Sequence, residues 1–455
     1  MKIKELRSRL RGELITSDDP GLERAHEALI WNGRKPGRQA RLIVRAACVE
    51  DVQEAVRFAA ESGLTVSPRG GGHQFTGIAA KADMVIDLGA LDGLKIDVAA
   101  RSARIEPAVT NERMATVLAR HDLAFPLGHC GSVPMSGYLL GGGVGWNSGA
   151  WGIACFSVMA VEVVLADGRL VTAAADENPE IFWAARGAGP RFFGIVTAYH
   201  VRLHQAPRAI LTSVRVYPLD AVDQVAAWAE QAMARAPANI EFTTKISAAP
   251  PQMPVGGMIL QAIATVFASG EAEARALLAA LAEGAPEGTL HRLDDVPTPF
   301  DVLYELTAKS MPEGRRYAVD SVWSDATYPE VLGEVVRAMT QAPSPESIAL
   351  VMLRSPMARN VEDAAFSQIG RIFGAVYGIW QDPVADRPMI DWLRTTMDTI
   401  APLGLGTYAG ESDLDRGPRR LKIHSAAAAA RIDELASRFD PEGLFGGPGA
   451  RARAA

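Results

Sequence analysis

The sequence has few cysteines and no long apolar run, and its first residues do not show the pattern expected of a secretory leader. The three cysteines, Cys48, Cys130 and Cys155, are odd in number and too few for a disulfide scaffold, which favours a reducing, cytoplasmic setting. Apolar runs such as 161–166 are broken by charge well before a membrane-spanning length, so we expect no membrane partner. The first residues alternate charge with leucine, which is not the pattern of a signal peptide.

A block of positive charge is also missing. The 455 residues carry 46 basic and 53 acidic side chains, a formal net charge of −7, and no basic cluster stands out. We therefore expect no nucleic-acid partner. Hydrophobic residues make up 48% and charged residues 22%, which is typical of a globular protein, and the length predicts two or three domains. We expect no metal, and the pattern does not define an oligomeric state.

The composition and the predicted secondary structure change at two points along the chain. The pattern as a whole predicts an α+β protein. Residues 1–207 hold most of the glycine-rich loops, set between short apolar strands. Within them, 41–73 predicts strand, helix, strand and loop, the helix beginning near Glu50 and ending at Gly63. A second, amphipathic helix is predicted from Asn111, with Asn111 as its cap.

Residues 208–404 alternate strands with alanine-rich helices. This order predicts one antiparallel sheet with helices over one face, forming a separate α+β domain. Residues 405–455 contain a further helix, predicted over 426–437, before Pro441.

The first motif that carries chemistry is Arg69-Gly70-Gly71-Gly72-His73, directly after a predicted strand. Three glycines permit backbone conformations closed to other residues, and their N–H groups can form a nest for a diphosphate. The plainer interpretation is a tight turn that carries a surface histidine.

The second motif is a longer glycine-rich stretch. It contains Gly128-His129-Cys130, then Ser136-Gly137, and then the run 141–145 with glycine at four of its five positions. Its spacing does not match a Rossmann fingerprint, because no Gly-x-Gly-x-x-Gly opens a helix after the first strand. A nicotinamide-dependent reductase is therefore a weak alternative.

Five ordered segments together resemble a known family. The sequence is similar to the berberine-bridge-enzyme-like branch of the vanillyl-alcohol-oxidase (PCMH-type) flavoproteins. The resemblance implies a two-subdomain PCMH-type FAD-binding domain in 1–207, a substrate-binding α+β domain in 208–404, and a C-terminal segment, 405–455, that returns to the FAD domain. The matching segments are 28–34, 48–77, 130–145, 175–203 and 438–445.

The resemblance implies covalent FAD. His73 would bond to the 8α-methyl carbon of the flavin, since a neutral imidazole is a competent nucleophile. Cys130 matches the position of a second bond, to flavin C6, and His129 could help to form its thiolate. The alternative for Cys130 is a small packing residue. Both bonds lie on one edge of the ring, so the two loops must meet there.

Further residues match the family's cofactor-binding positions. Val133 stands at the family's oxygen gatekeeper, where valine accompanies oxidases. Ile195 and Val196 match a strand whose backbone faces the flavin. The remaining implied cofactor-binding residues are Arg69, Gly70, Gly71, Gly72, Gly77, Ser136, Gly137, Gly141, Gly142, Gly143 and Gly145.

The implied activity is removal of a hydride from a small organic substrate (an alcohol, sugar, amine or phenol), with molecular oxygen as acceptor and hydrogen peroxide as product. Tyr408 is the predicted catalytic base, with Glu411, Asp413 and His129 as alternatives. Tyr138 and Tyr377 could line the substrate site. Gly410 replaces the asparagine of the family's Tyr-x-Asn motif, so a flavin-binding protein without turnover stays open, as does a dehydrogenase with another acceptor.

Overall fold

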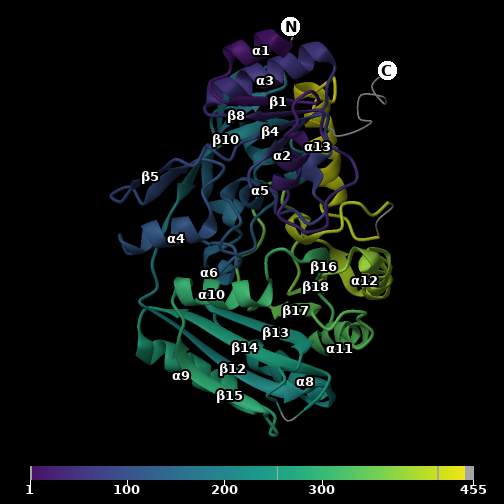
Figure 1. Ribbon diagram of the computed structural model, residues 1–455. Coiled ribbons are helices and arrows are strands. Elements are labelled where there is room, and N and C mark those ends of the chain that lie inside the picture. Colours follow the sequence, from purple (N-terminus) through teal and green to yellow (C-terminus); the bar gives the residue numbers. More distant parts are fainter. Residues whose placement is uncertain (1–2, 254, 418–419, 446–455) are drawn as a thin grey trace.

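The computed structural model describes residues 3–253, 255–417 and 420–445 and has an α+β fold in two halves (Figure 1). The first half contains two sheets with helices around them. The second contains one large antiparallel sheet with four helices on one side and one further helix on the side that faces the first half. This confirms the predicted fold class. None of the helices in the described part of the chain is long and apolar enough to cross a membrane.

The sheet nearest the N-terminus positions the first glycine motif. Its strand order is β1-β2-β4-β3, with β2 and β3 both parallel to β4. Helix α3 (Val49–Ser62) connects β2 to β3 and ends at Gly63 in the left-handed conformation, as predicted. Because β3 ends at Arg69, the glycine run begins where the strand stops. The strands are β1 (Glu13–Thr16), β2 (Leu42–Arg45), β3 (Val66–Arg69) and β4 (Met84–Asp87), and the flanking helices are α1 (Ile3–Arg9) and α2 (Leu22–Ala28).

A second, antiparallel sheet positions the other glycine-rich stretch. Its order is β5-β6-β10-β8-β9, and Tyr199 on β10 donates a hydrogen bond to the carbonyl of Ser136, 2.9 Å away. The strands are β5 (Leu94–Asp97), β6 (Ser102–Ile105), β8 (Val158–Leu165), β9 (Leu170–Ala174) and β10 (Gly194–Arg202), with a short pair β7 (Leu123–Ala124) and β11 (His204–Gln205) beside them. The helices of this region are α4 (Asn111–Ala119), α5 (Met135–Leu140), α6 (Ser148–Trp151) and α7 (Pro179–Ala185).

The large sheet has eight strands, in the order β15-β12-β14-β13-β17-β18-β16-β19. They are β12 (Ala209–Pro218), β13 (Ile240–Ala248), β14 (Met258–Ala268), β15 (His291–Pro297), β16 (Arg316–Ser324), β17 (Ile348–Leu353), β18 (Ile372–Trp380) and β19 (Gly404–Gly406). Its helices are α8 (Val222–Met233), α9 (Glu271–Ala282), α10 (Phe300–Ser310), α11 (Tyr328–Met339) and α12 (Asp386–Ile400).

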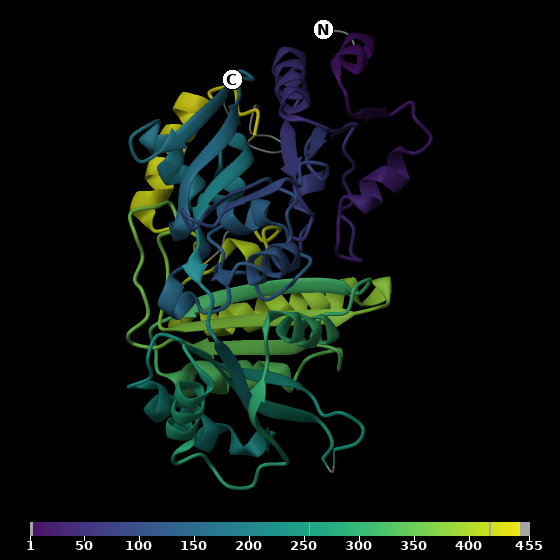
Figure 2. The same cartoon turned by 90° about the vertical axis from the view of Figure 1, so that its left-hand side faces the viewer.

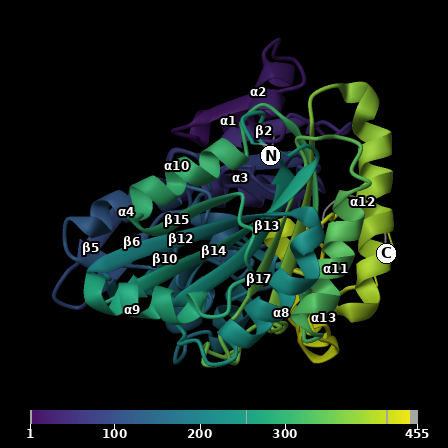
Figure 3. The same cartoon turned by 90° about the horizontal axis from the view of Figure 1, so that it is seen from below.

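The two faces of this sheet have different partners. Alternate residues of β13 such as Phe242 and Ile246 share a core with α8, α9, α11 and α12, which Figure 3 shows from below. The opposite face meets the first half of the molecule, where Phe75 and Phe156 pack among Tyr377 and other side chains of β16, β17 and β18. Residues that follow the glycine motifs therefore meet the predicted substrate-site residues Tyr377 and Tyr408 between the two halves.

The C-terminal segment packs back on the first half (Figure 2). Helix α13 (Ala426–Phe439) carries Phe439, whose ring stacks on Phe193 at 5.3 Å. Beyond it, the Leu444 carbonyl accepts a hydrogen bond from the backbone N–H of Val66 in β3. The segment thereby braces the strand that leads to the glycine motif; residues 446–455 lie outside the described part.

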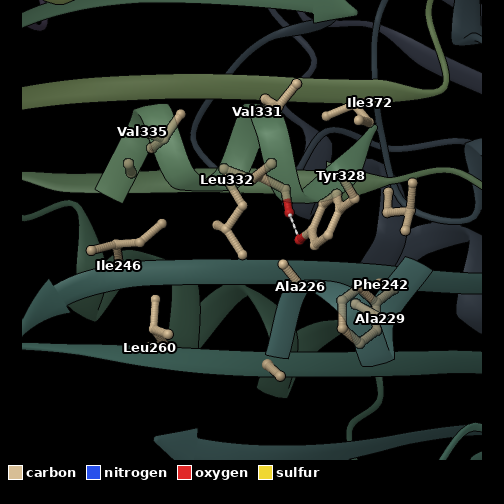
Figure 4. Close-up of a cluster of buried hydrophobic side chains, with 14 of the residues drawn as sticks. Ala226, Ala229, Phe242, Ile246, Leu260, Tyr328, Val331, Leu332, Val335 and Ile372 are labelled. Atoms are coloured by element: carbon tan, nitrogen blue, oxygen red, sulfur yellow. Dashed lines mark hydrogen bonds between the residues drawn. The ribbon is translucent and has the colours of Figure 1, made fainter. Parts of the chain in front are cut away.

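Figure 4 shows the core between α11 and the large sheet, which should contribute strongly to the stability of the fold. Leu332 on α11 is fully buried there. Leu332→Ala should lower the free energy of unfolding by about 2–5 kcal/mol, because it leaves a cavity in a packed core. Denaturant unfolding followed by circular dichroism measures this, with Leu306→Ala on the half-exposed face of α10 as the matched control. Equal stability of the two variants would contradict the assignment of this core.

Candidate active site

The first glycine motif is a loop pressed between two other segments. A side chain at Gly70 would meet Ser136 Oγ at 1.7 Å, and one at Gly71 would meet Pro134 at 2.5 Å. The glycines therefore let this loop lie directly against the second glycine-rich stretch.

The backbone N–H groups of this loop are available to a ligand. None of those at Gly70, Gly71, Gly72 and His73 donates a hydrogen bond to another described residue. Arg69 is occupied instead: its guanidinium pairs with Asp87 at 3.2 Å and bonds the carbonyls of Leu29 and Gly71. The structure thus places Arg69 as a brace for the loop, and the free N–H groups form the surface that suits an anion.

His73 is held as a neutral imidazole. Burial, with the nearby charge of Arg69, lowers the pKa of His73 to about 4, although a hydrogen bond to the backbone of Ser132 acts in the other direction. Its ring stacks on Trp31, with the centroids 5.2 Å apart and the planes at 23°. At neutral pH the ring therefore keeps a nitrogen lone pair.

The loop that carries Cys130 is clamped by Asn111. This fully buried side chain accepts a hydrogen bond from the N–H of Gly128 at 2.8 Å and donates to the carbonyls of Val133 at 2.9 Å and Cys130 at 3.3 Å. The prediction of Asn111 as a helix cap was wrong. Thr110 caps α4 through its side chain, and Asn111 is the first residue of the helix, so its amide is free to hold the loop.

His73 and Cys130 meet at Ser132. The Cys130 thiol lies 3.5 Å from Ser132 Oγ, and the backbone of the same residue is close enough to the His73 ring to act on its pKa. The structure therefore brings together the two side chains that the sequence singled out. The thiol is partly exposed, whereas Cys155 is buried.

The second glycine run packs beneath Tyr408. Gly142 and Gly143 have φ values of +120° and +87°, which favour glycine. Burial and the Glu411 carboxylate raise the pKa of the Tyr408 phenol well above its usual range, while the N–H groups of Val144 and Gly143 partly offset this. A side chain at residue 410 would lie 2.7 Å from the Tyr408 ring, so Gly410 permits this placement of the phenol.

Glu411 lies beside Tyr408 and is bonded to a second tyrosine. Burial raises the pKa of Glu411, while a hydrogen bond donated by Tyr377 and the charge of His129 act to lower it. Its Oε2 atom is buried and has no hydrogen-bond partner in the described part of the chain. An unpartnered carboxylate oxygen at this place is an acceptor for a ligand proton.

His129 pairs with Glu241 on β13, at 2.7 Å, and its ring lies 4.1 Å from that of Trp146. Burial acts to lower the pKa of His129, but Glu241 and Glu411 raise it overall. The imidazole thus points to the large sheet.

Other predicted residues have structural partners. Asp413 forms an ion pair with Arg394 at 2.7 Å, and the Tyr138 hydroxyl donates to the carbonyl of Pro126 at 2.6 Å. Ile195 and Val196 are buried in β10. Val133 packs partly buried on the core of the second sheet.

Gly77, Gly137, Gly141 and Gly145 have different surroundings. Gly77 precedes a turn with φ of +64°, and Gly145 lies against the Leu127 carbonyl. A side chain at Gly141 would lie 3.0 Å from the carbonyl of Gly137, whereas one at Gly137 would meet only open space.

Sequence reasoning missed several residues of the site. Glu241 stood out only as an acidic residue in a strand of alternating pattern. Nothing in the sequence pointed to Tyr304, which lies on α10 near Cys130. Within the described chain, buried atoms without hydrogen-bond partners gather in this region: Trp146 Nε1, Glu241 Oε2, Tyr304 Oη and Glu411 Oε2. Such atoms are costly unless a ligand or water satisfies them.

The residues present fit FAD. The free N–H groups of the first loop suit a diphosphate, and a neutral imidazole lies close to a partly exposed thiol. The space beside Gly137 is open.

Comparison with known proteins agrees with this fit. A family model described as "FAD binding domain" matches residues 40–174. The chain is 30% identical over 445 residues to FAD-linked oxidoreductase ptmO of Penicillium ochrochloron, covering 97% of both chains. It is 37% identical over 203 residues to (R)-6-hydroxynicotine oxidase of Paenarthrobacter nicotinovorans, covering 44% of this chain and 43% of the relative.

A solved structure shares the whole fold. The berberine bridge enzyme of Eschscholzia californica superposes with a TM-score of 0.83 at 17% identity, over 97% of this chain and 96% of the other. With the full-length relative and the FAD-domain match, these findings show that the chain belongs to the FAD-linked oxidoreductases with a PCMH-type FAD-binding domain and a berberine-bridge-enzyme-like fold.

Proposed function

We propose that the protein is an oxidase that holds FAD through His73 and Cys130 and oxidises a small organic substrate with molecular oxygen. The observation that carries this is the convergence of His73 and Cys130 on Ser132. A neutral imidazole and a thiol that share one neighbouring residue suit attachment to one edge of a flavin. The 37% identical partial relative named as an oxidase supports the choice of oxygen as acceptor.

Bound FAD would accept two electrons from the substrate and pass them to oxygen, giving hydrogen peroxide. The chain's contribution is to bind the substrate and accept its proton. Loss of hydrogen from a carbon that bears a hydroxyl or amine requires a base for the heteroatom proton. The buried acceptors Glu411 Oε2 and Glu241 Oε2 suit a substrate with such a donor.

Glu411 is better suited than Tyr408 to act as the general base. The raised pKa of the Tyr408 phenol keeps that group protonated at neutral pH. Glu411 has a raised carboxyl pKa and an oxygen without a partner in the described chain, which is the state a general base needs. Tyr408, the base predicted from the sequence, would then orient the substrate.

The first prediction concerns attachment. Acid-precipitated wild-type protein should stay yellow, because a covalent bond survives unfolding. His73→Ala and Cys130→Ala should each break one bond, and the double variant should release all its FAD. Absorbance of pellet and supernatant measures this, with Cys48→Ala, which changes another partly exposed thiol, as control. A colourless wild-type pellet would refute covalent attachment.

The second prediction concerns the acceptor. With a substrate found in a panel of alcohols, sugars, amines and phenols, one hydrogen peroxide should form for each substrate oxidised. A peroxide electrode beside product analysis measures the ratio. Turnover that needs an added quinone and yields no peroxide would instead establish a dehydrogenase.

The third prediction separates the two bases. Glu411→Gln should lower kcat by about 10²–10⁴-fold, the usual contribution of a general base, while Tyr408→Phe should cost much less. Because the base must be ionised, wild-type kcat should fall as pH drops through the raised pKa of Glu411. A larger loss of kcat in Tyr408→Phe than in Glu411→Gln would instead identify Tyr408 as the general base.

A stability measurement tests the raised pKa of Glu411 without any substrate. A carboxyl pKa raised by folding favours the folded state below the unfolded pKa, and this advantage is lost as pH rises. Glu411→Gln should therefore raise Tm relative to the wild type at pH 8 more than at pH 5. An equal difference at both pH values would contradict the raised pKa.

A further inference from the structure

We propose that Asn32 and Trp31 are positioning residues that hold His73 for its attachment to FAD. This inference rests on the proposed covalent linkage through His73. The two residues lie in the segment after α2, far from His73 in sequence but in direct contact with its loop.

Asn32 joins three segments of the chain. It is fully buried, and its amide nitrogen donates to the carbonyls of Phe75 at 2.7 Å and Tyr317 at 2.9 Å. Its Oδ1 accepts from the N–H groups of Tyr317 and Arg34, both at 2.9 Å. The side chain thus uses both donors and both acceptor sites, and it ties the His73 loop to β16 of the large sheet.

Trp31 fixes the imidazole itself. Its backbone N–H donates to the carbonyl of Gly72 at 3.1 Å, and its ring stacks on His73. The indole also contacts the rings of Tyr317, with the centroids 5.0 Å apart, and of Phe75, with the centroids 6.3 Å apart. The His73 ring therefore rests on an aromatic stack that is anchored by the residue Asn32 holds.

The glycine loop is shaped to receive this segment. Gly72 has a φ of +66°, and a Cβ there would lie 1.8 Å from the carbonyl oxygen of Leu29. The same carbonyl accepts a hydrogen bond from Arg69 Nε at 3.1 Å. Residues 29–32 and 69–75 therefore lie against each other along their length, and no side chain fits between them at Gly72.

Attachment needs a fixed position of the His73 ring, because the imidazole and the flavin methyl group react only when they are correctly oriented. The imidazole N–H and one C–H of the 8α-methyl are replaced by a nitrogen–carbon bond, and molecular oxygen takes the two electrons and two protons as hydrogen peroxide. The contact with the Trp31 ring sets the orientation of the imidazole, and with it the direction in which a ring nitrogen can reach the flavin methyl group. A misplacement of about 1 Å can slow such a reaction about 100-fold.

The test compares four variants that keep His73. Asn32→Ala and Trp31→Leu should slow attachment to His73 about tenfold to a hundredfold, so that purified protein carries less FAD bonded to the peptide that contains His73. Trp31→Phe keeps a ring under His73 and should restore most of the attachment. Trp228→Leu removes a buried indole from the distant core of the large sheet and should attach FAD like the wild type.

The readout is the share of bound FAD that remains on the tryptic peptide 70–81, measured by mass spectrometry, and its rise during incubation in air. Tm is measured on each sample, and Trp31→Leu decides the matter if Asn32→Ala does not fold. Wild-type attachment in both Asn32→Ala and Trp31→Leu would overturn the inference, as would an equal loss in Trp228→Leu. A wild type without flavin on this peptide would refute the linkage itself.

Discussion

The structure depends on the close approach of two glycine-rich loops. Gly70 and Gly71 lie so near Ser136 and Pro134 that no side chain could be placed between them. This contact brings the loop ends to Ser132, where the His73 ring and the Cys130 thiol both make a contact. Each loop is held from behind by a buried asparagine, Asn32 on one side and Asn111 on the other. The rigidity of the site thus comes from backbone hydrogen bonds that a few buried amides satisfy.

The large sheet supplies the other side of the site. One face of its strands packs on four helices, so the opposite face is free to meet the FAD-binding half. Glu241 on β13, Tyr377 on β18 and the segment with Tyr408 and Glu411 all reach the junction from this side. In the proposed reaction, the loops of the first half would hold the cofactor, while side chains from the second would bind the substrate and accept its proton.

Much of this could be predicted from the sequence. The strand–helix–strand leading to His73 and the alternating strands and helices of 208–404 followed from local patterns, since these depend on residues that are near in sequence. The meeting of the two glycine motifs was implied only by the family resemblance. The roles of Asn32, Asn111 and Glu241 did not, because an amide or carboxylate gains its role from partners far along the chain, such as Tyr317 for Asn32. The N-cap was wrongly given to Asn111 for the same reason: Thr110 serves the helix and leaves the amide to the loop.

Peptide mass spectrometry of the trypsin-digested wild-type protein tests the central claim most directly. Peptides 70–81 and 121–169 carry His73 and Cys130. If both side chains are bonded to one edge of the same flavin ring, the two peptides should appear as a single species joined by one FAD. Unmodified forms of both peptides, or flavin found on other residues, would contradict the account.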